Sequence, residues 1–171
     1  TLAAIALHAV RNLSLQLGDT AAVIGVGLIG QLAVQLLDLA GIRVVALDYD
    51  PSRLDLARYG RAELAWNLAD GDPARAVREI TNGLGCDGVL IAAATSDSQP
   101  FVTAADIARD RARVCLVGHT GTELPYREFM AKELSVIVSR SYGPGRYDED
   151  FEGRGMKYPP GFVRWTESRN L

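Results

Sequence analysis

The chain has 171 residues, of which 48% are hydrophobic and 23% are charged, and its formal net charge is −3. This length fits one domain with one core, and the composition is that of a globular rather than a disordered or fibrous protein. The charge gives no basic excess of the kind that favours nucleic-acid binding. No apolar run approaches the roughly 18 residues of a membrane span, so a cytoplasmic setting is expected.

The first half of the chain alternates between helix and strand patterns. Apolar residues recur at helical spacing in residues 1–13, which predicts an amphipathic linking helix before the first strand. Short apolar runs then alternate with longer periodic segments, and proline or glycine marks several boundaries. The patterns predict strands at 21–24, 42–47 and 63–67 and helices at 28–40 and 51–59. This order forms a βαβαβ unit.

A second half repeats the alternation. The patterns predict helices at 73–80, 101–108 and 126–130 and strands at 88–91, 112–117 and 134–139. Strands that are continuous apolar runs are typical of a parallel sheet covered on both faces. Since short crossovers between parallel strands are right-handed, the sequence predicts an α/β fold with a doubly wound, six-stranded parallel sheet.

Both ends of the chain differ from this regular pattern. Beyond Ser141 the composition shifts to glycine, proline, arginine and aromatic residues, which predicts an extended tail at 142–171 after a domain at 1–141. The chain opens at Thr1 without methionine, and its first residues are already helical and apolar. We therefore expect a segment of a longer protein, with the tail leading to further parts of it.

The two cysteines give no sign of a metal site. Cys86 and Cys115 lie 29 positions apart within apolar runs, outside any CxxC or Cys-His spacing. We expect both to be buried, reduced thiols, and we predict no metal site in this chain.

A glycine-rich motif follows the first predicted strand. Residues 25–30, Gly-Val-Gly-Leu-Ile-Gly, match GxGxxG and open the next predicted helix. Asp48 ends the second predicted strand, 18 positions after Gly30. A GxGxxG motif alone is weak, because glycine turns are common, but this context is the fingerprint of a Rossmann dinucleotide-binding domain.

Each position of the motif has a physical role in such a site. Gly25 permits the tight turn, Gly27 leaves room for the pyrophosphate, and Gly30 lets the helix approach the strands. The backbone N–H groups of Leu28 and Ile29, with the helix dipole behind them, would hold the diphosphate. The alternative is a glycine turn that binds no ligand.

The residue at the end of the second strand selects between cofactors. The Asp48 carboxylate can accept hydrogen bonds from the adenosine 2′,3′-diol but would repel a 2′-phosphate, which favours NAD over NADP. Arg53 and Tyr49 are candidates for the adenosine side, with an ordinary solvated surface position as the alternative for each.

Loops after the later strands are the other candidate contacts, since ligands sit outside the carboxyl ends of such sheets. Small residues follow the fourth strand at Ala93, Ala94 and Thr95, and Gly118 and His119 follow the fifth. They could approach the nicotinamide or serve packing alone. His119 has no neighbouring carboxylate, so no catalytic residue is predicted in this chain.

Other classes of enzyme leave different signatures. The chain contains no Tyr-x-x-x-Lys, GxSxG, HExxH or Walker lysine. Methyltransferases that use S-adenosylmethionine share the glycine turn but usually carry an acid two residues before its first glycine, where this chain has Val23. A non-catalytic NAD-sensing module is a second alternative.

Residues 1–141 resemble the cofactor domain of the zinc-containing medium-chain alcohol dehydrogenases. The resemblance rests on Thr-Leu-Ala-Ala-Ile-Ala-Leu-His-Ala-Val-Arg at 1–11, Val-Ile-Gly-Val-Gly-Leu-Ile-Gly-Gln-Leu-Ala-Val-Gln at 23–35 and Val-Val-Ala-Leu-Asp-Tyr-Asp-Pro-Ser-Arg at 44–53. It implies an NAD(H)-binding domain that positions nicotinamide for hydride transfer with an alcohol or carbonyl substrate. The positions that match the family's nucleotide site are Gly25, Gly27, Gly30, Asp48, Arg53 and Gly118.

The same resemblance implies what lies outside this chain. In the family the catalytic zinc and its ligands belong to a separate domain, so this fragment alone is expected to be inactive. The last strand, 134–139, would pair with its copy in a homodimer; the alternative is that the aromatic tail covers this edge strand. The tail is similar to that of a bacterial subgroup in which the dehydrogenase is fused to a second oxidoreductase domain.

Overall fold

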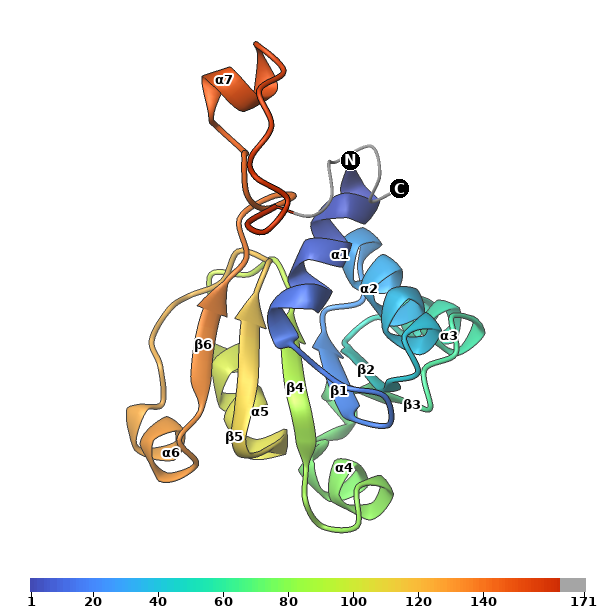
Figure 1. Cartoon of the computed structure of the whole chain (residues 1–171). Coiled ribbons are helices and arrows are strands. Elements are labelled where there is room, and N and C mark those ends of the chain that lie inside the picture. Colours follow the sequence, from blue (N-terminus) through green and yellow to red (C-terminus); the bar gives the residue numbers. More distant parts are fainter. Residues whose placement is uncertain (164–171) are drawn as a thin grey trace.

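The computed structural model describes residues 1–163, and its centre is a six-stranded sheet (Figure 1). The strands lie in the order β3-β2-β1-β4-β5-β6, and every neighbouring pair is parallel. Their bounds are β1 Thr20–Ile24, β2 Arg43–Asp48, β3 Leu64–Asn67, β4 Cys86–Ile91, β5 Ala108–Leu116 and β6 Ser135–Val138. This is the doubly wound Rossmann order, so the predicted fold is confirmed.

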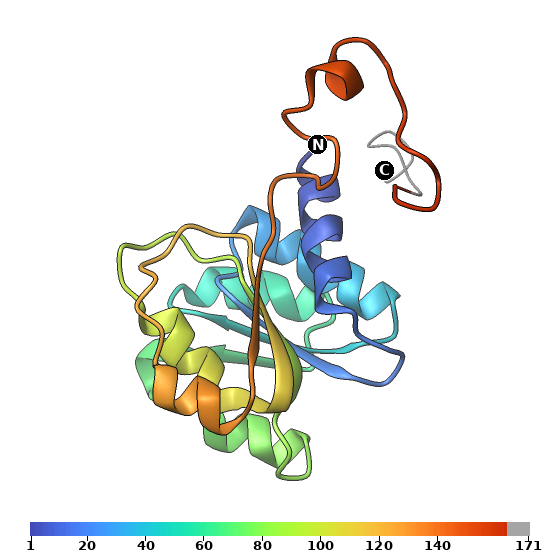
Figure 2. The same cartoon turned by 60° about the vertical axis from the view of Figure 1, so that its left-hand side comes forward.

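Helices cover both faces of the sheet, as Figures 1 and 2 show from two directions. One layer contains α1, α2 and α3, and the other contains α4, α5 and α6. Their bounds are α1 Leu2–Leu13, α2 Leu28–Leu39, α3 Pro51–Tyr59, α4 Ala74–Ile80, α5 Gln99–Ile107 and α6 Tyr126–Ala131, with a short 3-10 helix at Leu68–Asp70. Within residues 1–163, no helix has the length and apolar character needed to cross a membrane.

Side chains of the central strand divide between two hydrophobic clusters. Val23 of β1 packs in a cluster with α1, α2 and α3, whereas its neighbours Ala22 and Ile24 pack with α4 and α5. This alternation follows from the two-residue period of a strand. Every residue of β1 is buried, which explains why the strand is a continuous apolar run after Thr20 and does not alternate between polar and apolar residues.

The boundary between α5 and β5 differs from the prediction. The helix was expected at 101–108 and the strand at 112–117, but β5 begins at Ala108, directly after α5. Cys86 pairs with Ala108 and Gly88 then pairs with Arg113, so β5 bulges between the two pairs. Arg111 takes a φ of +60° inside this bulge. The charged residues of the bulge interrupt the apolar pattern, so the sequence did not predict this part of the strand.

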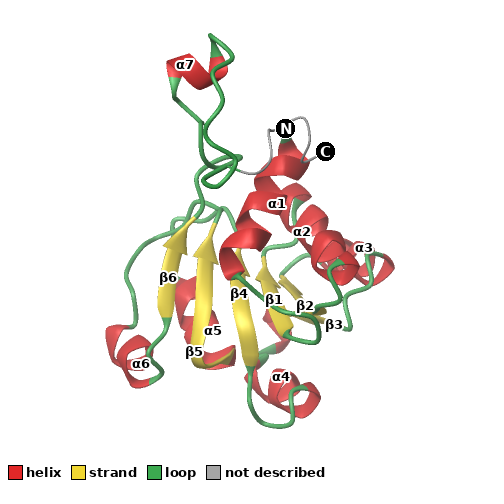
Figure 3. Ribbon diagram, in the orientation of Figure 1, coloured by secondary structure: helices red, strands yellow, loops and turns green. Residues whose placement is uncertain are grey.

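The segment after β6 extends away from the sheet and carries a short helix, α7 (Glu149–Glu152), which the sequence analysis did not predict (Figures 1 and 3). Contacts within the segment hold it together. Arg146 pairs with Glu152 at 2.6 Å, and the rings of Phe151 and Tyr158 stack with centroids 5.3 Å apart. Residues 164–171 of the predicted tail lie outside the described residues.

Candidate functional site

A cavity of about 490 Å³ opens where β1, β2 and β4 end. Seven residues singled out from the sequence line it: Gly25, Asp48, Tyr49, Arg53, Ala93, Ala94 and Thr95. The other lining residues are Ile24, Asp50, Asp97, Gln99 and Pro100. The carboxyl ends of three strands thus form one site, at the place where ligands bind in open α/β sheets.

The turn after β1 requires glycine at its first position. Gly25 has a φ of +86°, and a Cβ atom there would lie 2.7 Å from both the Cα and the backbone N of Ala93. Its N–H donates to the carbonyl oxygen of Leu47 at 2.8 Å. A side chain at this position would therefore strain the backbone and collide with the loop after β4.

The remaining glycines of the motif have different surroundings. A Cβ at Gly27 would meet no atom within 4 Å, whereas one at Gly30 would lie 2.1 Å from the carbonyl oxygen of Gly25. Gly27 is the N-cap of α2, so no side chain caps the first N–H groups, which include those of Leu28 and Ile29. Gly30 packs the helix onto the turn, and Gly27 leaves open space at the helix N-terminus.

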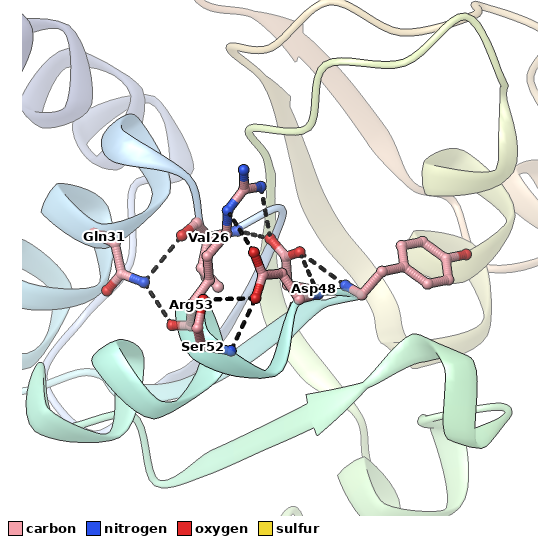
Figure 4. A network of polar contacts seen from close by, with 7 residues as sticks. Val26, Gln31, Asp48, Ser52 and Arg53 are labelled. Atoms are coloured by element: carbon pink, nitrogen blue, oxygen red, sulfur yellow. Dashed lines mark hydrogen bonds and ion pairs between the residues drawn. The ribbon is translucent and has the colours of Figure 1, made fainter.

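The carboxylate of Asp48 is buried and already hydrogen-bonded, as Figure 4 shows. Its Oδ1 accepts from the N–H groups of Tyr49 and Asp50 at 2.8 and 3.0 Å. Its Oδ2 accepts from the N–H of Val26 at 2.8 Å. A carboxylate offers about four acceptor positions, so one position, on Oδ2, is left for a ligand.

Arg53 of α3 brings a positive charge to the same corner. Its Nη1 lies 3.9 Å from Oδ2 of Asp48 and its Nε lies 3.5 Å from Oδ2 of Asp50. The hydroxyl and the N–H of Ser52 donate to Asp50, and these hydrogen bonds lower the pKa of Asp50. Two carboxylates thus lie beside one half-exposed guanidinium, so the formal charge of the corner is negative.

Gln31 supports this corner from behind, and sequence reasoning did not identify it. Its Nε2 donates to the carbonyl oxygens of Val26 and Arg53, at 2.9 and 2.7 Å (Figure 4). The side chain therefore joins the glycine turn to α3. A single polar residue on the buried face of an amphipathic helix gives no sequence signal for such a bridge.

The loops after β4 and β5 form the opposite wall. Ala94 and His119 make an isolated parallel bridge, and the N–H of Thr95 donates to the carbonyl oxygen of His119 at 2.9 Å. A Cβ at Gly118 would lie 2.1 Å from the carbonyl oxygen of Ala93. Gly118 and His119 do not line the cavity; they hold in place the loop that does.

Asp97 and Gln99 also line the cavity and were not singled out from the sequence. The N–H of Asp97 donates to Oγ1 of Thr95 at 3.1 Å, and Oδ1 of Asp97 accepts from the N–H of Gln99 at 2.9 Å. These are ordinary turn contacts between neighbours. Polar loop residues of this kind are common, so only their placement in the fold brings them to the site.

The described residues do not fit a zinc site. No three His, Cys, Asp or Glu side chains among residues 1–163 come together as a group that could hold a metal. Cys86 and Cys115 are both fully buried, as expected, and they lie in the two separate hydrophobic clusters. Burial raises the pKa of Cys86 to about 12 and that of Cys115 to about 11, so neither is a ready thiolate ligand.

Comparison with known proteins agrees with the Rossmann fold and the position of the cavity. A family model described as zinc-binding dehydrogenase matches residues 29–153. D-guloside 3-dehydrogenase from Escherichia coli is 33% identical over 98 residues, which are 56% of this chain and 28% of that protein.

Solved structures share the fold over most of this chain. The alcohol dehydrogenase TADH from Thermus sp. ATN1 has a TM-score of 0.73 at 27% identity, covering 83% of this chain and 41% of that one. Galactitol-1-phosphate dehydrogenase from Escherichia coli has a TM-score of 0.72 at 26% identity, covering 88% and 45%. The chain therefore spans less than half the length of these relatives.

Proposed function

Because the chain belongs to the zinc-binding dehydrogenase family, as the NAD-binding part of medium-chain alcohol dehydrogenases, we propose that it holds NAD(H) across the carboxyl edge of its sheet. The observation that carries the proposal is the uncapped N-terminus of α2, which opens beside the buried carboxylate of Asp48. In a dinucleotide, the diphosphate can bind the N-terminus of α2 and a ribose hydroxyl can bind the carboxylate of Asp48.

The diphosphate is assigned to the turn between β1 and α2. The N–H groups of Leu28 and Ile29 start the helix, and the open space at Gly27 lets a phosphate approach the backbone. Helix N-termini bind anions because their N–H groups are unpaired and the helix dipole is positive there. Gly25 and Gly30 shape the turn and do not themselves need to contact the ligand.

The adenosine half is assigned to the corner formed by Asp48, Tyr49 and Arg53. Oδ2 of Asp48 has one acceptor position left for a ribose hydroxyl. Asp48 and Asp50 outnumber the single guanidinium of Arg53. The net negative charge disfavours a 2′-phosphate, so we expect NAD to bind more tightly than NADP.

The chemistry of the whole protein follows from the cofactor. NAD supplies or accepts the hydride, and this domain supplies its position. The substrate is proposed to be an alcohol or carbonyl compound, bound against parts of the protein beyond this chain. Those parts would also carry the family's zinc, so the chain alone is expected to bind cofactor without turnover.

The test is isothermal titration of the purified chain with NADH, NADPH and S-adenosylmethionine in parallel. We expect heat with NADH, weaker binding of NADPH, and none with S-adenosylmethionine. Heat with S-adenosylmethionine alone would instead indicate a methyltransferase, and silence with all three would overturn the proposal for this chain. Binding of NADH by a whole protein without dehydrogenase activity would favour the NAD-sensing alternative.

We also propose that β6 pairs with its copy in a second subunit. β6 is the last strand of the sheet, its one neighbour among the described residues is β5, and Val138 is 71% exposed. An open, apolar edge of this kind favours pairing with another strand. A Val138→Lys chain should sediment as a monomer while the unsubstituted chain sediments as a dimer, and a monomer for both would contradict the pairing.

A further inference from the structure

The turn between α4 and β4, residues 81–85, contains the asparagine–glycine pair Asn82-Gly83. The chain has four asparagines, and each of the other three precedes leucine. Asparagine is a thermolabile residue, because the backbone nitrogen of the next residue can attack its side-chain amide. A glycine in that next position has no side chain to obstruct the attack. Asn82 is therefore the asparagine at which this reaction meets the least steric resistance.

The side chain of Asn82 is exposed and makes no hydrogen bond within residues 1–163. The other two asparagines in this range are restrained. Nδ2 of Asn12 contacts Nε2 of His8 at 3.3 Å, and Oδ1 of Asn67 accepts from the N–H of Ala69 at 2.9 Å. The amide of Asn82 can thus rotate toward the following backbone nitrogen, whereas the amides of Asn12 and Asn67 are held by their contacts.

The backbone of the turn restrains the attacking nitrogen. Asn82 has a φ of +52° directly after Thr81, the C-cap of α4. The N–H of Gly83 donates to the carbonyl oxygen of Arg78 at 2.8 Å. These are the features of a Schellman motif, in which a residue in the left-handed region ends the helix. Because the Gly83 nitrogen is held by this hydrogen bond, the reaction requires the turn to open first.

Little buried surface holds the turn closed. α4 has seven residues, of which Ala74 and Val77 are the buried ones. Residues 82–84 are all exposed, and Leu84 is 72% exposed. Segments with few buried apolar contacts open locally at a free energy well below that of global unfolding. We therefore expect the turn to open while the sheet stays folded.

We propose that Asn82 is a site of spontaneous deamidation in the folded chain, reached when this turn opens. The Gly83 nitrogen attacks Cγ of Asn82, the new C–N bond closes a succinimide ring, and the proton of Gly83 leaves with Nδ2 as ammonia. Water then opens the ring at either carbonyl. One product is aspartate, and the other is isoaspartate, in which the chain continues through Cγ. Both products carry a new carboxylate, and no oxidant or reductant takes part.

Isoaspartate at position 82 would loosen the connection between α4 and β4. Its backbone is one carbon longer, so the N–H of Gly83 can no longer match the carbonyl oxygen of Arg78. The N–H of Gly85 donates to the buried hydroxyl of Thr81 at 2.9 Å, and this contact spans the same turn. The turn precedes β4 and lies at the sheet edge opposite the cavity (Figure 1). The modified chain should therefore lose stability while the cavity keeps its lining.

Mass spectrometry of tryptic peptides measures the reaction. The chain is incubated at mildly alkaline pH, folded in one sample and unfolded in urea in the other. Peptide 79–109 contains Asn82 as its one asparagine, and replacement of the amide NH2 by OH raises its mass. The folded chain should convert about ten- to a hundredfold more slowly than the unfolded chain, because the turn is open for part of the time. Peptide 62–75, which contains Asn67, is the internal control and should keep its mass in the folded chain.

Asn82→Gly is the matched variant. Glycine removes the reactive amide and suits the left-handed conformation of this position. The variant should show no mass gain in peptide 79–109 and no fall of its unfolding temperature with time, whereas the unsubstituted chain should show both. An enzyme that methylates isoaspartate should label the aged unsubstituted chain more strongly than the aged variant, which retains Asp87-Gly88 as background.

Three outcomes would overturn the inference. Conversion in urea with none in the folded chain would show that the turn does not open. Equal rates in the two samples would show that the hydrogen bond between Gly83 and Arg78 does not control the reaction. An equal mass gain in peptide 62–75 of the folded chain would show that Asn82 is no more reactive than a restrained asparagine.

Discussion

Val26 donates its backbone N–H to Oδ2 of Asp48 at 2.8 Å, and this contact ties the glycine turn after β1 to the end of β2. The two residues are 22 positions apart in the chain. Asp48 therefore has a structural task in addition to its proposed contact with the cofactor. Removing its carboxylate should therefore lower the free energy of unfolding even when no ligand is present.

Asp48→Ala is expected to destabilise the free chain by about 2–3 kcal/mol, because three backbone N–H groups lose a charged acceptor at a buried site. Urea unfolding monitored by circular dichroism measures the change. Asp55→Ala is the matched control, since Asp55 is exposed and, among residues 1–163, its one ion pair is with Arg58, three positions further along α3. It should change stability by less than about 0.5 kcal/mol. Equal effects would show that the contacts of Asp48 carry no special stability.

Gly25→Ala and Gly27→Ala separate folding from binding. The first places a Cβ 2.7 Å from backbone atoms of Ala93 at a positive φ, so it should cost several kcal/mol or prevent folding. The second meets open space, so its unfolding temperature should match that of the unsubstituted chain while NADH binds about tenfold more weakly or worse. Unchanged NADH affinity in Gly27→Ala would place the diphosphate elsewhere.

Gln31→Leu tests the bridge behind the site. The substitution keeps the approximate side-chain volume but leaves the carbonyl oxygens of Val26 and Arg53 without their donor, at a cost of about 1–3 kcal/mol. Gln35→Leu, one turn further along α2, removes only a 3.3 Å contact to a helix carbonyl and should cost much less. Equal losses in urea unfolding would mean that the bridge contributes nothing measurable.

The pH dependence of stability should contain a contribution from His8. Burial, and then the charge of Arg11, lower the pKa of His8 below 6.5, and a Cβ at Gly143 would lie only 2.7 Å from Nδ1 of the His8 ring. The unfolded chain thus binds the proton more readily than the folded chain. This contribution to stability is complete above the unfolded value and is lost as the pH falls below it toward the lowered pKa.

His8→Gln is expected to reduce the slope of unfolding free energy against pH at pH values below about 6.5, the ordinary pKa of histidine. Urea titrations at several pH values measure the slope for both chains. An identical slope in the variant would show that protonation of His8 has no effect on folding.

Much of the fold could be predicted from the sequence because apolar periodicity and strand burial coincide. β1 is buried on both faces and consists of one threonine followed by four apolar residues. The start of β5 could not be predicted, because Arg109 and Arg111 look like loop residues. Only the structure shows that Arg109 pairs with Asp87 at 2.6 Å and that Arg111 donates its N–H to the carbonyl oxygen of Lys132.

The site was predictable where a backbone requirement dictates the residue type. Gly25 and Asp48 are distinctive because a turn and a strand end permit few alternatives there. Gln31 is a common polar residue, and its importance depends on which atoms lie around it. Tertiary contacts of this kind leave no local pattern in a single sequence.

Ala93 lies between two glycines that come from different strands. A Cβ at Gly25, after β1, would lie 2.7 Å from backbone atoms of Ala93, and a Cβ at Gly118, after β5, would lie 2.1 Å from its carbonyl oxygen. The loops after β1, β4 and β5 therefore meet at Ala93, where they leave no room for a further side-chain atom. Gly25, Ala93 and Gly118 are therefore expected to vary together in evolution. A larger residue at either glycine can be accommodated only if the backbone at Ala93 shifts.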